Sequence, residues 1–499
     1  MLYESSRGNH KNFKSVEVIK RGIAPDGGLF VPERITELKP EIIDKMSGMN
    51  YCERANVILE PFLSDYTKEE LEKCIMNAYN LEKFDTEEIA PVHKLDDTVY
   101  MLELWHGPTC AFKDMALQIL PHLLVKAMEK TDEKKEIVIL VATSGDTGKA
   151  ALEGFRDVKG TRVIVFYPYK GVSQIQEMQM VTQEGNNVFP IAVKGNFDDA
   201  QSGVKKIFTD KEFNKTLEEK GFSFSSANSI NWGRLVPQIV YYFSAYADMV
   251  KNKWIKSGQE VNITVPTGNF GNILAAFYAM KMGLPVKKLI CASNENNVLT
   301  EFINTGVYNR NRLFKKTMSP SMDILISSNL ERLLYELTEH NSQLINQWMS
   351  DLSSSGVYEV DNDTKLKVKE IFWADYCSEE DTLATISNTY EKYGYLIDTH
   401  TAVGLNVYWK YKEATKDNTK TIIASTASPF KFNKSVAQAI LSAEDIEGKN
   451  EFELLDELSQ KTSVPIPKSL KELRNKEIKH DKVCEKSEMK QQVEKALGK

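Results

Sequence analysis

Several features that would mark a secreted, membrane-bound or zinc-binding protein are scarce in this sequence. Its 499 residues include six scattered cysteines and no C-x-x-C pair, so we expect neither a disulfide framework nor a zinc site. No run of about 18 apolar residues is present, which argues against a membrane-spanning helix. The first residues lack the apolar stretch of a secretory signal. Together these absences favour a cytoplasmic protein.

Basic charge and metal-binding patterns are also lacking. The net charge of −7 is unfavourable for general nucleic-acid binding, which depends on basic surface. The seven histidines show no metal-ligand spacing, and neither H-E-x-x-H nor G-x-S-x-G occurs. We therefore expect no metal, no nucleic acid and no membrane partner. What remains is an ordinary globular composition, 42% hydrophobic and 27% charged, with length for about two to four domains.

The texture of the chain changes near Val99, where short apolar segments begin to alternate with helical ones. This alternation is typical of a parallel α/β sheet. It predicts strands at 100–104, 137–142, 162–167, 188–193, 262–265, 289–292 and 421–425. It predicts helices at 115–128, 149–155, 273–282 and 435–441. Ligands of such folds collect at the carboxyl ends of the strands, so the loops there are the first candidates for a site.

The same pattern divides the chain into four segments. These are a mainly helical domain at 1–95, a small α/β subdomain at 96–260, a large α/β domain at 261–465 with a helical insert at about 315–395, and a helical tail at 466–499. In the tail, Met489, Val493, Ala496 and Leu497 fall at helical spacing. This spacing predicts a short amphipathic helix that docks on the body of the protein.

Lys113 is the first candidate for chemistry. In the segment HGPTCAFKD (106–114), a strand ends, a Gly-Pro turn follows, and Lys113 lies between apolar residues where a helix begins. A lysine removed from water has a lowered pKa and becomes nucleophilic. A lone lysine is more often a surface residue, but the His, Gly, Pro, Thr and Asp residues clustered here favour a reactive one.

Two turns have the composition of anion sites. The segment TSGDTG (143–148) follows one apolar strand, and GNFGN (268–272) follows another and precedes an apolar helix. Backbone N–H groups at a helix N-terminus bind phosphate or carboxylate groups well. Neither segment has the spacing of a Walker A loop or of G-x-G-x-x-G, and either one alone could be a turn without a ligand.

Two further segments contain polar groups of the right kind. Arg234 ends the segment NSINWGR (228–234) and could clamp a phosphate or a carboxylate, although a lone arginine is more often a surface or ion-pairing residue. The segment STASP (425–429) closes a strand with hydroxyl groups, which often do no more than cap the next helix.

Taken together, these segments resemble the threonine synthase family, within the fold-type-II pyridoxal-phosphate enzymes. The resemblance covers most of the chain, from DGGLFVP (26–32) through the segments above, TMSPSMDILISSNLERLL (317–334) and DTHTAVG (398–404). The patterns HGPTxAFKD and SPSMDIxxSSNxER are the most specific. The chain departs from the family at Ser428, where His is usual, and at Thr399, where Pro is usual.

The resemblance implies two open, twisted, mostly parallel sheets with flanking helices, together with a helical N-terminal domain. It implies pyridoxal 5'-phosphate as the cofactor and O-phosphohomoserine as the substrate, in a monomer or a homodimer. The implied reaction yields threonine and phosphate by γ-elimination followed by β-replacement.

The resemblance also assigns roles to individual residues. Lys113 resembles the Schiff-base lysine and proton shuttle. The residues that resemble the cradle of the cofactor phosphate are Gly268, Asn269, Phe270, Gly271 and Asn272. Thr426 resembles the partner of the pyridine nitrogen. The residues that resemble substrate-binding groups are Thr143, Ser144, Asp146, Thr147, Asn228 and Arg234.

Three other functions fit parts of the same pattern. A related phospholyase would use this site but release 2-oxobutyrate. A dehydratase of the same fold is a second alternative, against which SPSMDI and NSINWGR argue. A catalytically silent binding protein is a third, and the intact Lys113 and both phosphate loops argue against it.

Overall fold

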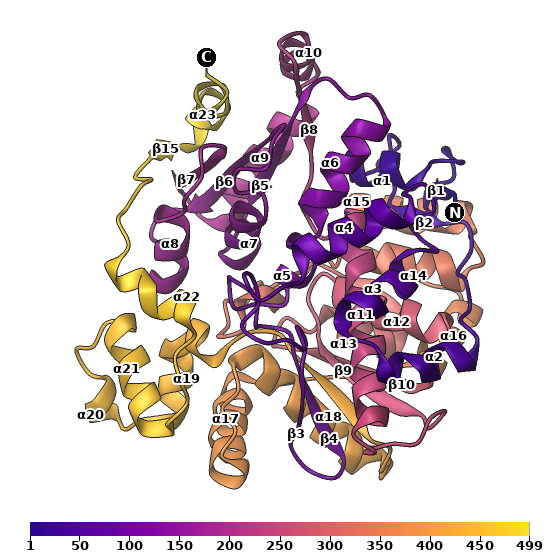
Figure 1. Ribbon diagram of the computed structural model, residues 1–499, viewed down its shortest axis with the longest axis vertical. Coiled ribbons are helices and arrows are strands. Elements are labelled where there is room, and N and C mark those ends of the chain that lie inside the picture. Colours follow the sequence, from indigo (N-terminus) through magenta and orange to yellow (C-terminus); the bar gives the residue numbers. More distant parts are fainter. Residues whose placement is uncertain (499) are drawn as a thin grey trace.

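Two mostly parallel β-sheets organise the computed structural model, which describes residues 1–498 (Figure 1). The larger sheet has six strands in the order β13-β10-β9-β14-β4-β3, and the smaller has five in the order β15-β7-β6-β5-β8. Neighbouring strands are parallel in both sheets, except that β3 runs antiparallel to β4. The expected fold class is therefore confirmed.

The strands lie close to where the sequence predicts them. The larger sheet contains β3 (Val92–Lys94), β4 (Val99–Glu103), β9 (Val261–Pro266), β10 (Val286–Ser293), β13 (Phe372–Tyr376) and β14 (Thr421–Ser425). The smaller contains β5 (Glu136–Ala142), β6 (Thr161–Pro168), β7 (Val188–Lys194), β8 (Phe222–Ser225) and β15 (Val483–Glu485). Two short ribbons pair β1 (Tyr3–Ser5) with β2 (Phe30–Pro32) and β11 (Val307–Asn309) with β12 (Val357–Glu359).

Four strands of the two main sheets were not expected from the sequence, namely β3, β8, β13 and β15, and neither were the strands of the two short ribbons. They are short, and β13 falls inside the segment that we expected to be helical. The domain boundaries remain a proposal. The first boundary, after residue 95, passes through the larger sheet, because β3 before it pairs with β4 after it.

Helices cover both faces of the larger sheet, and the strand residues alternate between two cores. In β4, Tyr100 and Leu102 belong to the main core, whereas Val99 and Met101 belong to a second one. This alternation follows from the two-residue period of a strand. It also explains the near-continuous apolar strand sequences, because both faces are buried.

The helices fall into three groups along the chain. The N-terminal group is α1 (Ser15–Arg21), α2 (Pro40–Lys45), α3 (Tyr51–Leu59) and α4 (Lys68–Ala78). The second group is α5 (Asp114–Leu117), α6 (Leu120–Lys130), α7 (Asp146–Gly154), α8 (Gln174–Val181), α9 (Phe197–Thr209), α10 (Lys211–Glu219), α11 (Trp232–Lys251) and α12 (Gly271–Lys281). The third is α13 (Val298–Thr305), α14 (Leu330–Leu337), α15 (Ser342–Ser354), α16 (Asn362–Ile371), α17 (Glu379–Tyr393), α18 (Thr399–Thr415), α19 (Asn433–Ile440), α20 (Ala443–Ile446), α21 (Glu451–Thr462), α22 (Lys468–Lys471) and α23 (Met489–Ala496).

One helix prediction needs correction, and one long helix was missed. The single helix expected at 115–128 is two helices, α5 and α6, because Pro121 at the start of α6 lacks an N–H and favours the beginning of a new helix. The 20-residue helix α11 was not expected. Most of its residues are buried, so it lacks the polar face that reveals a helix in a sequence. No helix within residues 1–498 combines the length and apolarity needed to cross a bilayer.

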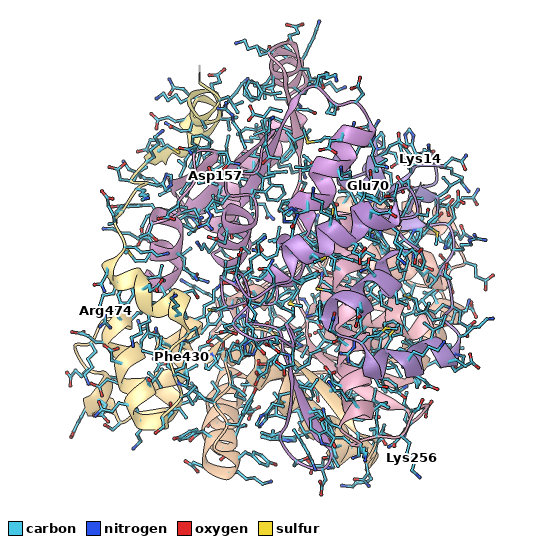
Figure 2. The ribbon with its side chains drawn as sticks, viewed as in Figure 1. Lys14, Glu70, Asp157, Lys256, Phe430 and Arg474 are labelled. Carbon is cyan, nitrogen blue, oxygen red and sulfur yellow. The ribbon has the colours of Figure 1, made fainter. Side chains whose placement is uncertain are left out.

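The C-terminal segment joins the two halves of the molecule. In Figure 1 it runs, in yellow, from α21 and α22 to β15 and α23. Near its start, Arg474, labelled in Figure 2, forms an ion pair with Asp456 at 2.6 Å. Farther along, β15 pairs with β7, and Met489 and Val493 are buried in the core that includes residues of α9. The short docked helix predicted from the spacing is α23.

The docking of α23 can be tested with Val493→Asp. Val493 is 0% exposed, so the substitution buries an unpaired carboxylate, and we expect the free energy of unfolding to fall by roughly 3 kcal/mol or more. Gln491→Asp, on the exposed side of the same helix, is the matched control and should change it by no more than about 0.5 kcal/mol. Equal effects in denaturant titrations would contradict the docked position.

Candidate active site

Lys113 lies in a buried position between three parts of the chain. Its side chain follows β4 at the start of α5 and is only 10% exposed. Its Nζ lies 3.1 Å from Asp146 Oδ2 and 3.0 Å from Ser321 Oγ. Burial lowers the pKa of Lys113 from its usual range, although the nearby carboxylate opposes this effect. The sequence predicted Lys113 and Asp146 as site residues, but not Ser321.

Backbone contacts hold the lysine segment against the end of β14. The N–H of Phe112 donates to the carbonyl of Thr426 at 2.8 Å, and Ala111 forms an isolated bridge with Ala427. Thr426 is itself 5% exposed. The residue predicted to meet the cofactor ring therefore lies beside the segment that carries the lysine.

The loop 143–148 places Asp146 at the start of α7. Thr143 Oγ1 accepts hydrogen bonds from the N–H groups of Gly145 and Gly148, both at 3.0 Å. Thr143 therefore stabilises the conformation of the loop, a role that the sequence did not reveal. Ser144 is exposed and Thr147 is half-buried, so both remain accessible to a ligand.

Asp146 contacts a second lysine on the side away from Lys113. Lys431 Nζ lies 3.0 Å from Asp146 Oδ1, and Gln176 Nε2 donates to the same oxygen at 3.1 Å. Burial alone would raise the pKa of Asp146, but Lys113 and Lys431 outweigh burial and hold it well below its usual range. Asp146 is therefore a buried carboxylate that is ionised between two lysines.

The loop 268–272 is held by the segment that follows Ser321. Ser327 Oγ donates to the carbonyl of Gly268 at 2.7 Å, and the N–H and Nδ2 of Asn329 donate to the carbonyl of Asn269 at 3.1 and 3.0 Å. A β-carbon at Gly268 would lie 2.7 Å from the carbonyl oxygen of Ser321, so this approach requires glycine.

The start of α12 offers a buried side-chain amide donor that has no partner among the described residues. Asn272 Oδ1 accepts from the hydroxyls of Tyr241 and Tyr242, which leaves its buried Nδ2 without a partner among residues 1–498. A β-carbon on Gly271 would meet Asn329 Nδ2 at 3.5 Å and Gln238 Nε2 at 3.9 Å. Unpartnered amide donors at a helix N-terminus fit a phosphate group.

Arg234 is a buried cation that has no carboxylate partner among residues 1–498. It lies on α11, is 3% exposed, and donates from Nη1 to the carbonyl of Ala227 at 2.5 Å. Its buried Nε has no partner among the described residues, and burial lowers its pKa to about 10. By contrast, the equally buried Arg54 forms an ion pair with Asp248 at 2.8 Å. A buried cation of this kind is stabilised by an anionic ligand.

Comparison with known proteins identifies the family of this chain. Residues 84–426 match the family described as "Pyridoxal-phosphate dependent enzyme". Residues 2–79 match "Threonine synthase N terminus", and residues 401–495 match "Threonine synthase, C-terminal". The chain belongs to the threonine synthase family. The resemblance inferred from the sequence motifs is thereby confirmed.

Individual relatives agree with this family. The threonine synthase of Schizosaccharomyces pombe is 38% identical over 472 residues, which cover 89% of this chain and 90% of that protein. The human protein threonine synthase-like 1 is 42% identical over 434 residues, which cover 85% of this chain but 58% of that longer protein.

Solved structures of family members extend the agreement to the fold. Yeast threonine synthase matches with a TM-score of 0.88 and 33% identity, covering 100% of this chain and 99% of that one. The pyridoxal-phosphate-bound threonine synthase of Brucella melitensis matches with a TM-score of 0.87 and 33% identity, covering 99% of both chains. The cofactor of the family fits the cradle described at the start of α12.

The two departures from the family pattern are accommodated without disturbing the lysine. Thr399 Oγ1 donates to the carbonyl of Met318 at 2.7 Å. The backbone N–H of Ser428 donates to the carbonyl of Cys110 at 3.1 Å, and its side chain is fully buried. Both residues therefore secure the segments that flank Lys113.

Two histidines near the site have supporting roles. His106, singled out from the sequence, lies between Asp85 and Glu103, at 2.5 and 2.8 Å. Burial would lower its pKa, but the two carboxylates raise it to about 9. His400, which the sequence did not single out, accepts at Nε2 from the N–H of Ser321 at 3.2 Å. Within residues 1–498, no cluster of three or more His, Cys, Asp or Glu side chains is arranged to hold a metal ion.

The cradle at the start of α12 can be tested with Gly271→Val. The added methyl groups would enter the space beside Gln238 and Asn329, and we expect protein that is largely free of cofactor. The measurement is the bound pyridoxal phosphate per chain. Gly271→Ala should reduce it less, because its β-carbon makes only ordinary contacts, and thermal unfolding checks that both variants fold. Full occupancy in Gly271→Val would move the phosphate elsewhere, with the loop 143–148 next in line.

Proposed function

We propose that this protein is a threonine synthase, which converts O-phospho-L-homoserine and water to L-threonine and phosphate. The observation that carries the proposal is a pair of buried donors that have no partner among the described residues: Arg234 Nε, whose charge acts on Lys113, and Asn272 Nδ2 at the start of α12. Cofactor and substrate both carry a phosphate, so this reaction needs two anion sites. The likeness to proteins named threonine synthase over nearly the whole chain supports it.

The proposed mechanism gives Lys113 two tasks. Its Nζ would hold the cofactor, and as a free amine it would remove and return protons on the substrate carbons. Pyridoxal phosphate, when bound, supplies an electron sink for the negative charge that develops beside the α-carbon. Proton transfers at several carbons need a base that is regenerated, and an amine with a lowered pKa meets this need.

The surrounding side chains orient Lys113 and the substrate. Asp146 and Ser321 fix the position of Lys113 Nζ by hydrogen bonds of 3.1 and 3.0 Å. We assign the substrate phosphate to Arg234 and Asn228. The Arg234 guanidinium is buried and has no carboxylate partner among residues 1–498, and Asn228 is half-buried next to Ala227, whose carbonyl accepts from Arg234. Ser144 and Thr147 are then left for the substrate carboxylate.

The cellular setting and assembly remain part of the proposal. All six cysteines are unpaired, which suits a reducing compartment such as the cytoplasm. We propose a monomer or a homodimer that acts on a small molecule, without nucleic-acid or membrane partners.

We expect Lys113→Ala to abolish threonine formation, because both the covalent attachment and the base are lost. The assay follows phosphate, threonine and 2-oxobutyrate together from O-phosphohomoserine. Substantial threonine from the variant would contradict the role of Lys113. Phosphate with 2-oxobutyrate but no threonine from the unaltered protein would replace the proposal by the phospholyase alternative.

We expect Arg234→Gln to weaken the binding of O-phosphohomoserine much more than the binding of the cofactor. A charge-assisted hydrogen bond that is not made costs about 1.5–3 kcal/mol, or roughly tenfold to a hundredfold in affinity. Arg54→Gln is a matched control, because Arg54 is equally buried but ion-paired with Asp248. The control should lower stability and leave KM unchanged. If Arg234→Gln lost affinity for pyridoxal phosphate to the same extent, Arg234 would instead belong to the cofactor cradle.

A further inference from the structure

Asp146 is shared between two lysines, one on each carboxylate oxygen. Lys113 Nζ lies 3.1 Å from Oδ2, and Lys431 Nζ lies 3.0 Å from Oδ1. The Lys431 side chain is 0% exposed, and its Nζ also donates to the carbonyl of Thr109 at 2.7 Å. A lysine buried this completely and aimed at the partner of the reactive lysine affects the charge at that site.

We propose that Lys431 is a positioning residue for the reaction at Lys113: it fixes the Asp146 carboxylate and adds a second positive charge that disfavours an ammonium at Lys113. The inference rests on the proposed function in one respect, namely that Lys113 acts as a neutral amine. It names a residue outside the sequence motifs, two positions beyond the end of STASP.

Lys431 is held rigidly enough for this role. It lies in a short 3₁₀ turn, Pro429–Phe432, and Phe430, labelled in Figure 2, precedes it beside the C-terminal helices. Its acceptor Thr109 is fixed in turn by Asp114, which accepts from the N–H and Oγ1 of Thr109 at 2.8 and 2.7 Å. Lys431 therefore joins Asp146 to the segment that carries Lys113.

The local charge balance explains why a second lysine matters. A single carboxylate paired with Lys113 alone would hold the proton on that amine. With Lys431 on its other oxygen, the Asp146 charge is divided between two cations. The other titratable groups that act on the cluster are Arg234 from α11, His400 from α18, and Cys110 and Asp114 from the lysine segment. Of the residues that contact Asp146, Gln176 and Ser321 are neutral.

Two substitutions should shift the protonation of the Lys113 nitrogen in opposite directions. Lys431→Met removes a repelling charge, and Asp146 then pairs with Lys113 alone. The Lys113 nitrogen should therefore keep its proton to higher pH. Asp146→Asn removes the attracting charge and leaves two cations, so the nitrogen should lose its proton at lower pH. A general loosening of the fold would not produce opposite shifts.

The test uses the full chain loaded with pyridoxal phosphate and follows its visible absorbance against pH. We expect Lys431→Met to move the midpoint of this absorbance titration to higher pH by roughly half to one unit. We expect kcat near neutral pH to fall at least about threefold with little change in KM, because one such unit is a tenfold change in the neutral fraction. Lys431→Arg, which retains the charge, should stay close to the unaltered protein in both measurements.

Lys149→Met is the matched control. Lys149 is also buried, with its side chain 10% exposed, but its ion pair is with Glu153 at 3.3 Å, whereas those of Asp146 are with Lys113 and Lys431. It should leave the midpoint unchanged. The same pH response in Lys431→Met and the unaltered protein would overturn the inference. If Lys431→Met does not fold, Asp146→Asn provides the test. A titration midpoint that does not move to lower pH in Asp146→Asn would also overturn the inference. Neither result affects the proposed function, which fails separately if Lys113→Ala still forms threonine.

Discussion

The buried ion pair between Lys113 and Asp146 is the interaction on which the rest of the site depends. Lys113 follows β4 of the six-stranded sheet, whereas Asp146 follows β5 of the five-stranded sheet. Their contact at 3.1 Å therefore brings the carboxyl ends of strands from both sheets to one place. A charged Lys113 could not be buried alone without a large desolvation cost, and Asp146 is the carboxylate that offsets this cost.

Around this pair, hydrogen bonds of side chains with backbone carbonyls and with Lys113 hold the loops in place. The segment from Thr317 to Asn329 contacts the loop 268–272 on one side and, through Ser321, contacts Lys113 on the other. At Gly268 a β-carbon would lie only 2.7 Å from the carbonyl oxygen of Ser321, which is too close for a residue with a side chain. The cradle and the lysine are thus placed by the same segment, and movement of one would disturb the other.

The sequence predicted the elements of the site better than the contacts between them. Strand, turn and helix signals placed Lys113 and both loops correctly, because each lies within a few residues of its own strand end. The partners that it missed lie far along the chain: Ser321 is 208 residues from Lys113, and Lys431 is 322 residues from Thr109. Such contacts arise from sheet topology, and local periodicity contains no information about them. Thr143 shows a second limit of sequence-based prediction. A hydroxyl that stabilises its own loop cannot be told from sequence apart from one that binds a ligand.

The balance of buried charge connects this arrangement to catalysis. Lys113, Lys431 and Arg234 are buried basic side chains, and Asp146 is the one carboxylate that forms ion pairs with any of them within the described part of the chain. Such an excess of positive charge destabilises the folded protein on its own but favours the binding of phosphate dianions. It also disfavours a proton on Lys113, which is the amine that must accept one. The same charges can therefore recruit both phosphates and keep the base in its reactive form.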